Sequence, residues 1–200
     1  MQPESLATIW LVRHGESVWN RAGRIQGQCP EAPGLTPLGR EQVAQCAAAL
    51  SGAGVQLVIA SDLTRAAETG QILAESLEVP LVLDARLRER ALGVAEGRAA
   101  ANVGDVELGL DPPVVKVPNR APVGAESLSE LYRRAAAFFG DLARDLPARR
   151  LVLATHGGFL RVAQAVLDRT PLEEMTWTPI HNAEFVQAVL SASALRGASA

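Results

Sequence analysis

The chain of 200 residues suits a single domain, and its 48% hydrophobic content is enough to bury a core of ordinary size. A formal net charge of −3 and a pI near 5.7 argue against a nucleic-acid partner or an anionic membrane surface. No stretch reaches the roughly 18 consecutive apolar residues of a membrane-spanning helix, so we expect no membrane partner.

The first residues and the two cysteines bear on the compartment. Residues 1–8 include Glu4 and lack the basic and apolar regions of a secretory signal, so we expect none. Cys29 and Cys46 could pair, but two cysteines in a chain of this size are typical of reduced thiols in the cytosol. We therefore predict a cytoplasmic protein.

Short apolar runs rich in strand-forming residues recur along the chain, each too short for a helix. They predict strands at 9–12, 57–60, 81–83, 151–154 and 185–190.

Helical patterns separate these runs. Thr36 and Pro37 predict the N-cap and first residue of a helix that extends to about residue 50. Ser61 or Asp62 can cap a second helix that lasts to about residue 77. Ser127 is the expected N-cap of a third helix, whose apolar residues from 128 to 146 fall at spacings of three and four. A fourth helix is predicted from residue 158 to about 167.

Strands that are apolar throughout and alternate with helices indicate a mostly parallel sheet with helices on both faces. We therefore predict an α/β fold, a three-layer αβα sandwich, in one domain over residues 1–200. Residues 84–125 show neither apolar runs nor helical spacing. This segment is too long for a simple connection, and we predict that it forms an active-site flap. The small, polar tail at 191–200 is expected to fray.

Ligands of such sheets bind beyond the carboxyl ends of the strands. His14 and His156 each follow a predicted strand directly, and each precedes a glycine. One histidine in this position is more often structural, but two of them, with Arg13 beside the first, favour a functional site. A phosphate dianion needs clustered cations, and an arginine fork matches two of its oxygens. Arg65 stands one turn into the second helix, although on spacing alone it could be a surface residue.

The segment from Leu11 to Asn20, LVRHGESVWN, resembles the signature of the histidine phosphatase superfamily, the phosphoglycerate mutase-like proteins. Similar blocks at 34–39, 61–69, 87–89 and 155–158 follow in the order of the family, so that the resemblance covers about residues 8 to 190.

The resemblance implies a role for each matching residue. His14 would be the nucleophile that forms a phosphohistidine, and Glu89 the general acid that then acts as the base. The phosphoryl oxygens would be bound by Arg13, Arg65 and His156. Further contacts with phosphate or substrate would come from Asn20, Gln26, Gly27 and Gly157. No metal or cofactor is expected, and the enzyme would be a metal-independent phosphomonoesterase of the histidine acid phosphatase type.

These roles carry physical requirements. The nucleophilic imidazole of His14 needs one unprotonated nitrogen, so the other should donate to a fixed acceptor such as a backbone carbonyl near Gly15. Glu89 can act as an acid only if partial burial raises its pKa. The alternative for Glu89 is a solvated carboxylate paired with Arg88 or Arg90.

Hydrolysis is favoured over a mutase reaction by comparison with mutases of the family. The interval from Glu89 to His156 is shorter than theirs, Ala100 replaces their lysine, and Leu92 replaces their tyrosine. A phosphoglycerate mutase-type phosphotransferase remains the alternative. A non-catalytic phospho-ligand binding module is a second, although it would predict loss of a histidine or arginine. A metallohydrolase is disfavoured because Arg13 would repel a cation.

The flap should determine which small phosphorylated substrate is accepted. An apolar wall could come from Leu92, Leu108, Leu110 and Val114, and contacts to an anionic substrate from Arg98, Lys116 and Arg120. His181 is expected to be incidental and Asn182 to be a turn or support residue. A homodimer is compatible with the family, and the substrate itself stays open.

Overall fold

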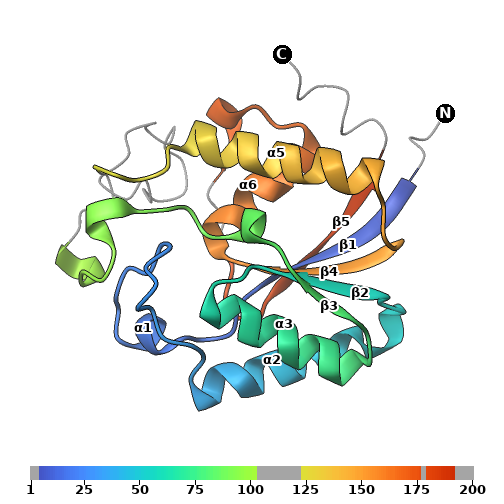
Figure 1. Cartoon of the computed structure of the whole chain (residues 1–200), viewed down its shortest axis with the longest axis horizontal. Coiled ribbons are helices and arrows are strands. Elements are labelled where there is room, and N and C mark those ends of the chain that lie inside the picture. The colour runs from blue at the N-terminus through green and yellow to red at the C-terminus, as the bar shows by residue number, and fades with distance from the viewer. Residues whose placement is uncertain (1–4, 103–122, 177–178, 192–200) are drawn as a thin grey trace.

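The computed structural model describes residues 5–102, 123–176 and 179–191. Its centre is a sheet of five strands in the order β3-β2-β4-β1-β5 (Figure 1). The strands are β1 (Ser5–Arg13), β2 (Leu57–Ala60), β3 (Leu81–Leu83), β4 (Arg150–Thr155) and β5 (Phe185–Ser191). Only β5 runs antiparallel to its neighbour, which confirms the predicted mostly parallel sheet.

Helices cover both faces of the sheet (Figure 1). One face carries α2 (Pro37–Leu50) and α3 (Thr64–Leu77), and the other carries α5 (Leu128–Arg144) and α6 (Gly157–Asp168). Alternate residues of β1 enter two separate cores, with Ile9 and Leu11 beneath α5 and α6, and Trp10 and Val12 beneath α2 and α3. The period-two geometry of a strand produces this division. The predicted three-layer αβα sandwich is therefore confirmed.

Helix starts follow local capping chemistry at two of the three predicted sites. The Thr36 hydroxyl accepts a hydrogen bond from the Gly39 amide at 2.9 Å. Ser127 forms a capping box with Glu130 at the start of α5. The proposed cap of α3 is wrong, because its N-cap is Leu63, which makes no side-chain cap hydrogen bond.

The two residues expected to cap α3 have other partners. Ser61 Oγ lies 2.9 Å from Nε2 of His156, and the Asp62 carboxylate pairs with Arg88 at 2.6 Å. Tertiary contacts thus override a local preference. A short helix that was not predicted, α1 (Val18–Arg21), begins at a capping box formed by Ser17 and Asn20.

In the described part of the predicted flap, Leu87 is fully buried in the core beneath α5 and α6, whereas the residues from 88 onward lie outside both main cores. This part contains three single turns of 3-10 helix, at Ala85–Leu87, Gly93–Ala95 and Ala100–Asn102. Ala95 packs on Ile25, whose backbone amide donates a hydrogen bond to the Arg98 carbonyl at 2.9 Å. The flap is therefore joined to the loop after α1. The rest of the flap, with Leu108, Leu110, Val114, Lys116 and Arg120, and the tail from 192 lie outside the described residues.

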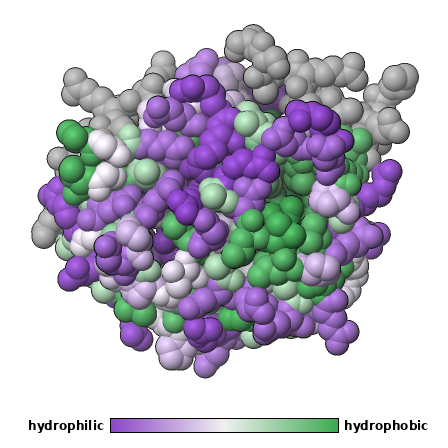
Figure 2. Space-filling model, viewed as in Figure 1, coloured by the Kyte–Doolittle hydropathy of each residue, from purple (hydrophilic) through white to green (hydrophobic). Residues whose placement is uncertain are grey.

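The surface is mixed in character. Figure 2 shows apolar residues gathered over the β3 edge of the sheet, where Val82 and Leu83 are half exposed. Within the described ranges, no helix is long and apolar enough to cross a membrane. Cys29 and Cys46 are both free thiols.

Candidate active site

Sheet topology brings the sequence-predicted residues together. His14 follows β1, His156 follows β4, and Arg65 lies in the first turn of α3 after β2. Since β2, β4 and β1 are adjacent and parallel, their carboxyl ends meet at one edge of the sheet. The rings of His14 and His156 are 5.2 Å apart between centroids, and Arg65 Nε lies 3.2 Å from His14 Nε2.

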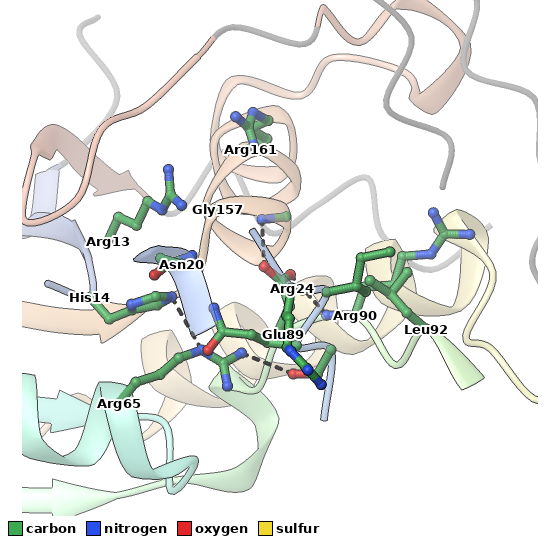
Figure 3. A pocket seen from close by; sticks show the side chains of 14 residues that line it. Arg13, His14, Asn20, Arg24, Arg65, Glu89, Arg90, Leu92, Gly157 and Arg161 are labelled. Atoms are coloured by element: carbon green, nitrogen blue, oxygen red, sulfur yellow. Dashed lines mark hydrogen bonds between the residues drawn. The ribbon is translucent and has the colours of Figure 1, made fainter. Parts of the chain in front are cut away.

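A pocket of about 290 Å³ opens at this edge (Figure 3). Eight of the nine predicted site residues line it, namely Arg13, His14, Asn20, Gln26, Gly27, Arg65, Glu89 and Gly157. His156 is the exception, because it is fully buried beside His14 and does not reach the pocket wall. The pocket thus gathers side chains from segments that are far apart in the sequence.

His14 is held in one tautomer. Its Nδ1 lies 2.7 Å from the Gly15 carbonyl oxygen, which can only accept a hydrogen bond, so Nδ1 carries the proton. Nε2 therefore has a lone pair, and it accepts the hydrogen bond from Arg65. Burial, followed by the charges of Arg65 and Arg13, lowers the pKa of His14 well below its usual 6.5. The ring is consequently neutral at neutral pH, with the lone pair on Nε2.

The backbone of His14 is also fixed. The Asn182 amide nitrogen donates to the His14 carbonyl at 3.0 Å, which fits the support role predicted for Asn182. His181 next to it is exposed, as expected for an incidental residue.

Two arginines bring positive charge to the pocket, Arg65 from a buried position and Arg13 from a half-buried one. Arg65 is 2% exposed, donates to the Gly27 carbonyl at 2.9 Å, and has its pKa lowered by burial to about 10. Arg13 donates from Nη1 to the Ile180 carbonyl. Its Nε is buried without a hydrogen-bond partner among the described residues, and burial lowers its pKa. Such guanidinium groups suit an anionic ligand, which would replace their lost hydration.

His156 is buried behind His14 and does not line the pocket. Its Nε2 contacts Ser61 Oγ, while Nδ1 is buried and has no partner in the described parts of the chain. Burial, then the charges of Arg65 and other neighbours, lowers the pKa of His156 well below 6.5. The ring is thus neutral and packed against His14 in an edge arrangement.

Glu89 enters the pocket from the start of the flap (Figure 3). Its carboxylate accepts the amides of Gly158 at 3.0 Å and Phe159 at 3.2 Å, both in the first turn of α6, and the Arg90 amide at 2.8 Å. A helix N-terminus favours a carboxylate in this position. The side chain is half buried. Arg88, offered as a surface partner for Glu89, pairs with Asp62 instead.

Three further arginines line the pocket and were not predicted there: Arg24, Arg90 and Arg161. Arg161 lies in α6, one helical turn after Gly157, and spacing alone does not distinguish such an arginine from a surface residue. Leu92 lines the pocket as an apolar wall residue, as predicted. Arg98 is exposed and does not line it.

Among the described residues, no three His, Cys, Asp or Glu side chains are grouped so that they could hold a metal ion.

Comparison with known proteins agrees with this geometry. The sequence profile of the histidine phosphatase superfamily (branch 1) matches residues 9–196. The chain therefore belongs to the histidine phosphatase superfamily.

Similar proteins include one named as a mutase and one named as a phosphatase. A protein of Enterobacter sp. (strain 638), named probable phosphoglycerate mutase GpmB, is 38% identical over 151 residues, covering 74% of this chain and 69% of the relative. The solved mycobacterial glucosyl-3-phosphoglycerate phosphatase, in complex with VO3, aligns with a TM-score of 0.78 and 28% identity over 90% of each chain. The Bacillus stearothermophilus protein YhfR aligns with a TM-score of 0.77 and 25% identity, covering 93% of this chain and 95% of that one.

Proposed function

We propose that this protein hydrolyses phosphomonoesters of small metabolites through a phosphohistidine formed on His14. The observation that supports this most directly is the tautomer of His14, whose Nε2 lone pair lies at the pocket wall beside the buried Arg65. The family membership and the phosphatase named among the solved relatives support the same reaction.

In the first step, Nε2 of His14 attacks phosphorus in line with the leaving oxygen. The N–P bond forms as the P–O bond breaks, and Arg13 and Arg65 stabilise the charge on the phosphoryl oxygens. His156 is assigned to the same phosphoryl group, and a small shift of its ring or of the substrate would be needed for contact. Glu89, protonated at this stage, gives its proton to the departing alkoxide, which leaves as the alcohol.

In the second step, the Glu89 carboxylate accepts a proton from water. The resulting hydroxide-like oxygen attacks phosphorus, the N–P bond breaks, and inorganic phosphate is released while His14 regains its lone pair. Asn20, Gln26, Gly27 and Gly157 are assigned to phosphate or substrate contacts, because all four line the pocket. No cofactor enters this sequence of bond changes.

We also infer that the reaction is independent of metal ions. Arg13 and Arg65 already supply positive charge where a Lewis-acidic cation would act, and they would repel one. Activity should therefore be unchanged in the presence of a chelator. A loss of activity in chelator that added Mg²⁺ or Zn²⁺ restores would contradict this.

A mutase reaction is the second candidate, because the curated relatives at 38% identity are named as probable phosphoglycerate mutases. Two residues argue against it. Leu92 lines the pocket with an apolar side chain that cannot donate to a substrate carboxylate, and Ala100 is exposed and does not line the pocket. We expect phosphate release from 3-phosphoglycerate to exceed isomerisation, and a coupled assay in which isomerisation is faster would reverse the assignment.

The central experiment traps the intermediate and removes the nucleophile. Rapid quenching with labelled phosphomonoester should leave acid-labile phosphate on the protein, and His14→Ala should abolish both the label and hydrolysis, by about 10⁴-fold or more in kcat. His181→Ala is the matched control, since His181 is exposed. Hydrolysis that survives His14→Ala would require another nucleophile, and binding of phosphate without turnover by the unaltered protein would indicate a binding module.

We further propose that the substrate is a small phosphorylated metabolite, and that the protein is cytoplasmic and can form a homodimer. A panel of phosphomonoesters, assayed with chelator present, should identify the substrate class. Sedimentation of the purified protein tests the homodimer, and cell fractionation tests the cytoplasmic location.

A further inference from the structure

Arg134 on α5 binds the backbone of the segment that carries Glu89. Its Nη1 donates to the carbonyl oxygens of Arg86 and Arg88, both at 2.8 Å. Its Nη2 lies 3.3 Å from the carbonyl oxygen of Glu89 itself. One guanidinium group therefore contacts three carbonyls within four residues of a segment that has no strand partner there.

The opposite side of the same guanidinium pairs with Glu126. Nε donates to Oε1 at 2.9 Å and Nη2 to Oε2 at 2.6 Å, a two-point contact that fixes the plane of the fork. The Glu126 carbonyl in turn accepts from Nε of Arg90 at 2.6 Å. Glu89 is thus held on both sides along the chain, through Arg88 before it and Arg90 after it.

The surroundings make this contact set stronger than a surface ion pair. The Arg134 and Glu126 side chains are only 20% and 15% exposed, so solvent screens them weakly. The Arg134 guanidinium also lies over the ring of Phe159, 5.6 Å from its centroid. The amide of this same Phe159 donates to the Glu89 carboxylate. Arg134 therefore contacts both the backbone of residues 86–89 and the turn of α6 that binds the Glu89 carboxylate.

We propose that Arg134 is a positioning residue that, together with Glu126, holds Glu89 in place for proton transfer to the leaving group. The proposal rests on the proposed role of Glu89 as general acid. Arg134 does not line the pocket, so it acts on the reaction through the placement of Glu89 rather than by contact with the substrate.

A positioning role for a general acid has a specific kinetic signature. An alkoxide must be protonated as it leaves, whereas p-nitrophenolate leaves readily without a proton. A small displacement of Glu89 should therefore lower kcat/KM for alkyl phosphates by about 10- to 100-fold. It should change kcat/KM for p-nitrophenyl phosphate by less than about 3-fold, since the remainder of the site is intact. A general loss of folding would lower both equally.

The experiment compares Arg134→Gln and Arg134→Lys with Arg133→Gln, the neighbouring exposed arginine, over a series of aryl and alkyl phosphates. We expect a steeper dependence of kcat/KM on leaving-group pKa in both Arg134 variants, partial recovery in the lysine variant, and no change in the Arg133 variant. Glu126→Gln removes the charge of the carboxylate that pairs with Arg134, so it should steepen the leaving-group dependence in the same way. This variant provides the test if an Arg134 variant does not fold. The proposal would be overturned if kcat/KM of the Arg134 and Glu126 variants were unchanged, or were lowered by the same factor for every leaving group.

Glu89→Gln separates this proposal from the proposed function. If Glu89→Gln steepens the leaving-group dependence and the Arg134 and Glu126 variants do not, Glu89 is the acid but Arg134 does not position it. If Glu89→Gln lowers all substrates equally, the assignment of the acid fails, and the inference on Arg134 fails with it. Phosphate trapping on His14 is scored independently of both.

Discussion

The two sides of the pocket are built in different ways. On one side, His14 and Arg65 are 3% and 2% exposed and stand at or just after the ends of core strands. On the other side, Glu89 lies between short 3-10 turns, outside the sheet, and is placed by hydrogen bonds from α6 and by Arg134 of α5. The first side is fixed by sheet register, and the second by polar side-chain contacts.

This difference has a physical consequence. A packed sheet leaves its strand ends little freedom, because any shift would disturb both cores at once. A segment held by a few hydrogen bonds can move at lower cost, since each contributes only about 0.5–3 kcal/mol. We infer that the side of the pocket with His14 and Arg65 is rigid, while the Glu89 side can be altered without loss of the fold.

Among conservative substitutions, the largest effect on activity should follow from a change at Arg65, on the rigid side. Arg65→Lys keeps the charge but loses the fork that reaches both His14 Nε2 and the Gly27 carbonyl. We expect kcat/KM to fall by about 10²–10³-fold for all leaving groups, because transition-state charge is less well stabilised. Arg40→Lys, on a side chain that is 52% exposed, is the control. A loss restricted to alkyl phosphates would place Arg65 in proton transfer instead.

A pair of glycine substitutions compares the two sides directly. A Cβ at Gly15 would lie 2.4 Å from the backbone oxygen of Gly39, which cannot move away freely. Gly15→Ala should therefore lower the free energy of unfolding by about 3 kcal/mol, the upper end for overpacking. A Cβ at Gly158 would lie 2.3 Å from Glu89 Oε1, the end of a side chain that can rotate.

Gly158→Ala should thus displace the Glu89 side chain without unfolding the protein. The gain in helix propensity, up to about 1 kcal/mol, offsets the strain, so that stability changes by less than about 1 kcal/mol. Activity on alkyl phosphates should fall about 10-fold. Denaturant unfolding and kinetics of both variants check this contrast, and equal destabilisation of the two would contradict it.

A further expected effect concerns the pH dependence of stability. Burial lowers the pKa of both His14 and His156 well below 6.5, so the folded protein keeps both rings neutral while the unfolded chain protonates them. Below pH 6.5 the unfolded state binds more protons, and the free energy of unfolding should fall by up to about 1.4 kcal/mol per pH unit for each ring. Above pH 6.5 this contribution to stability is fully present.

Urea unfolding between pH 7.5 and 5.5 measures this slope. His14→Asn should remove the contribution of one buried histidine to the dependence of the unfolding free energy on pH. His181→Asn, at an exposed histidine, should leave this dependence unchanged. Carboxylates also titrate in acid, but they are common to all variants and cancel in the comparison. The same slope in His14→Asn and in the unaltered protein would mean that His14 is not held neutral by the fold.

The strands and helices could be predicted closely because their signals are local. The strand at 57–60 and the cap at Ser127 rest on apolar runs and capping chemistry that a few neighbouring residues define. The short helix α1 was missed, and Ser61 was misassigned as a cap. The hydroxyl of Ser61 contacts His156, 95 residues away, and no local pattern contains that partner.

The sequence alone determined the layers, the strand ends and the histidine and arginine residues that follow them, because hydrophobic period and motif spacing are local properties of the chain. Only the tertiary structure decided that His156 lies behind His14 and that Arg24 and Arg161 reach the pocket. It also decided that Arg134 binds the backbone of residues 86–89. These contacts depend on the order β3-β2-β4-β1-β5 and on how α5 and α6 pack over the sheet. The order of strands brings together residues that the linear sequence keeps apart, and hydrogen bonds then select among the partners in reach.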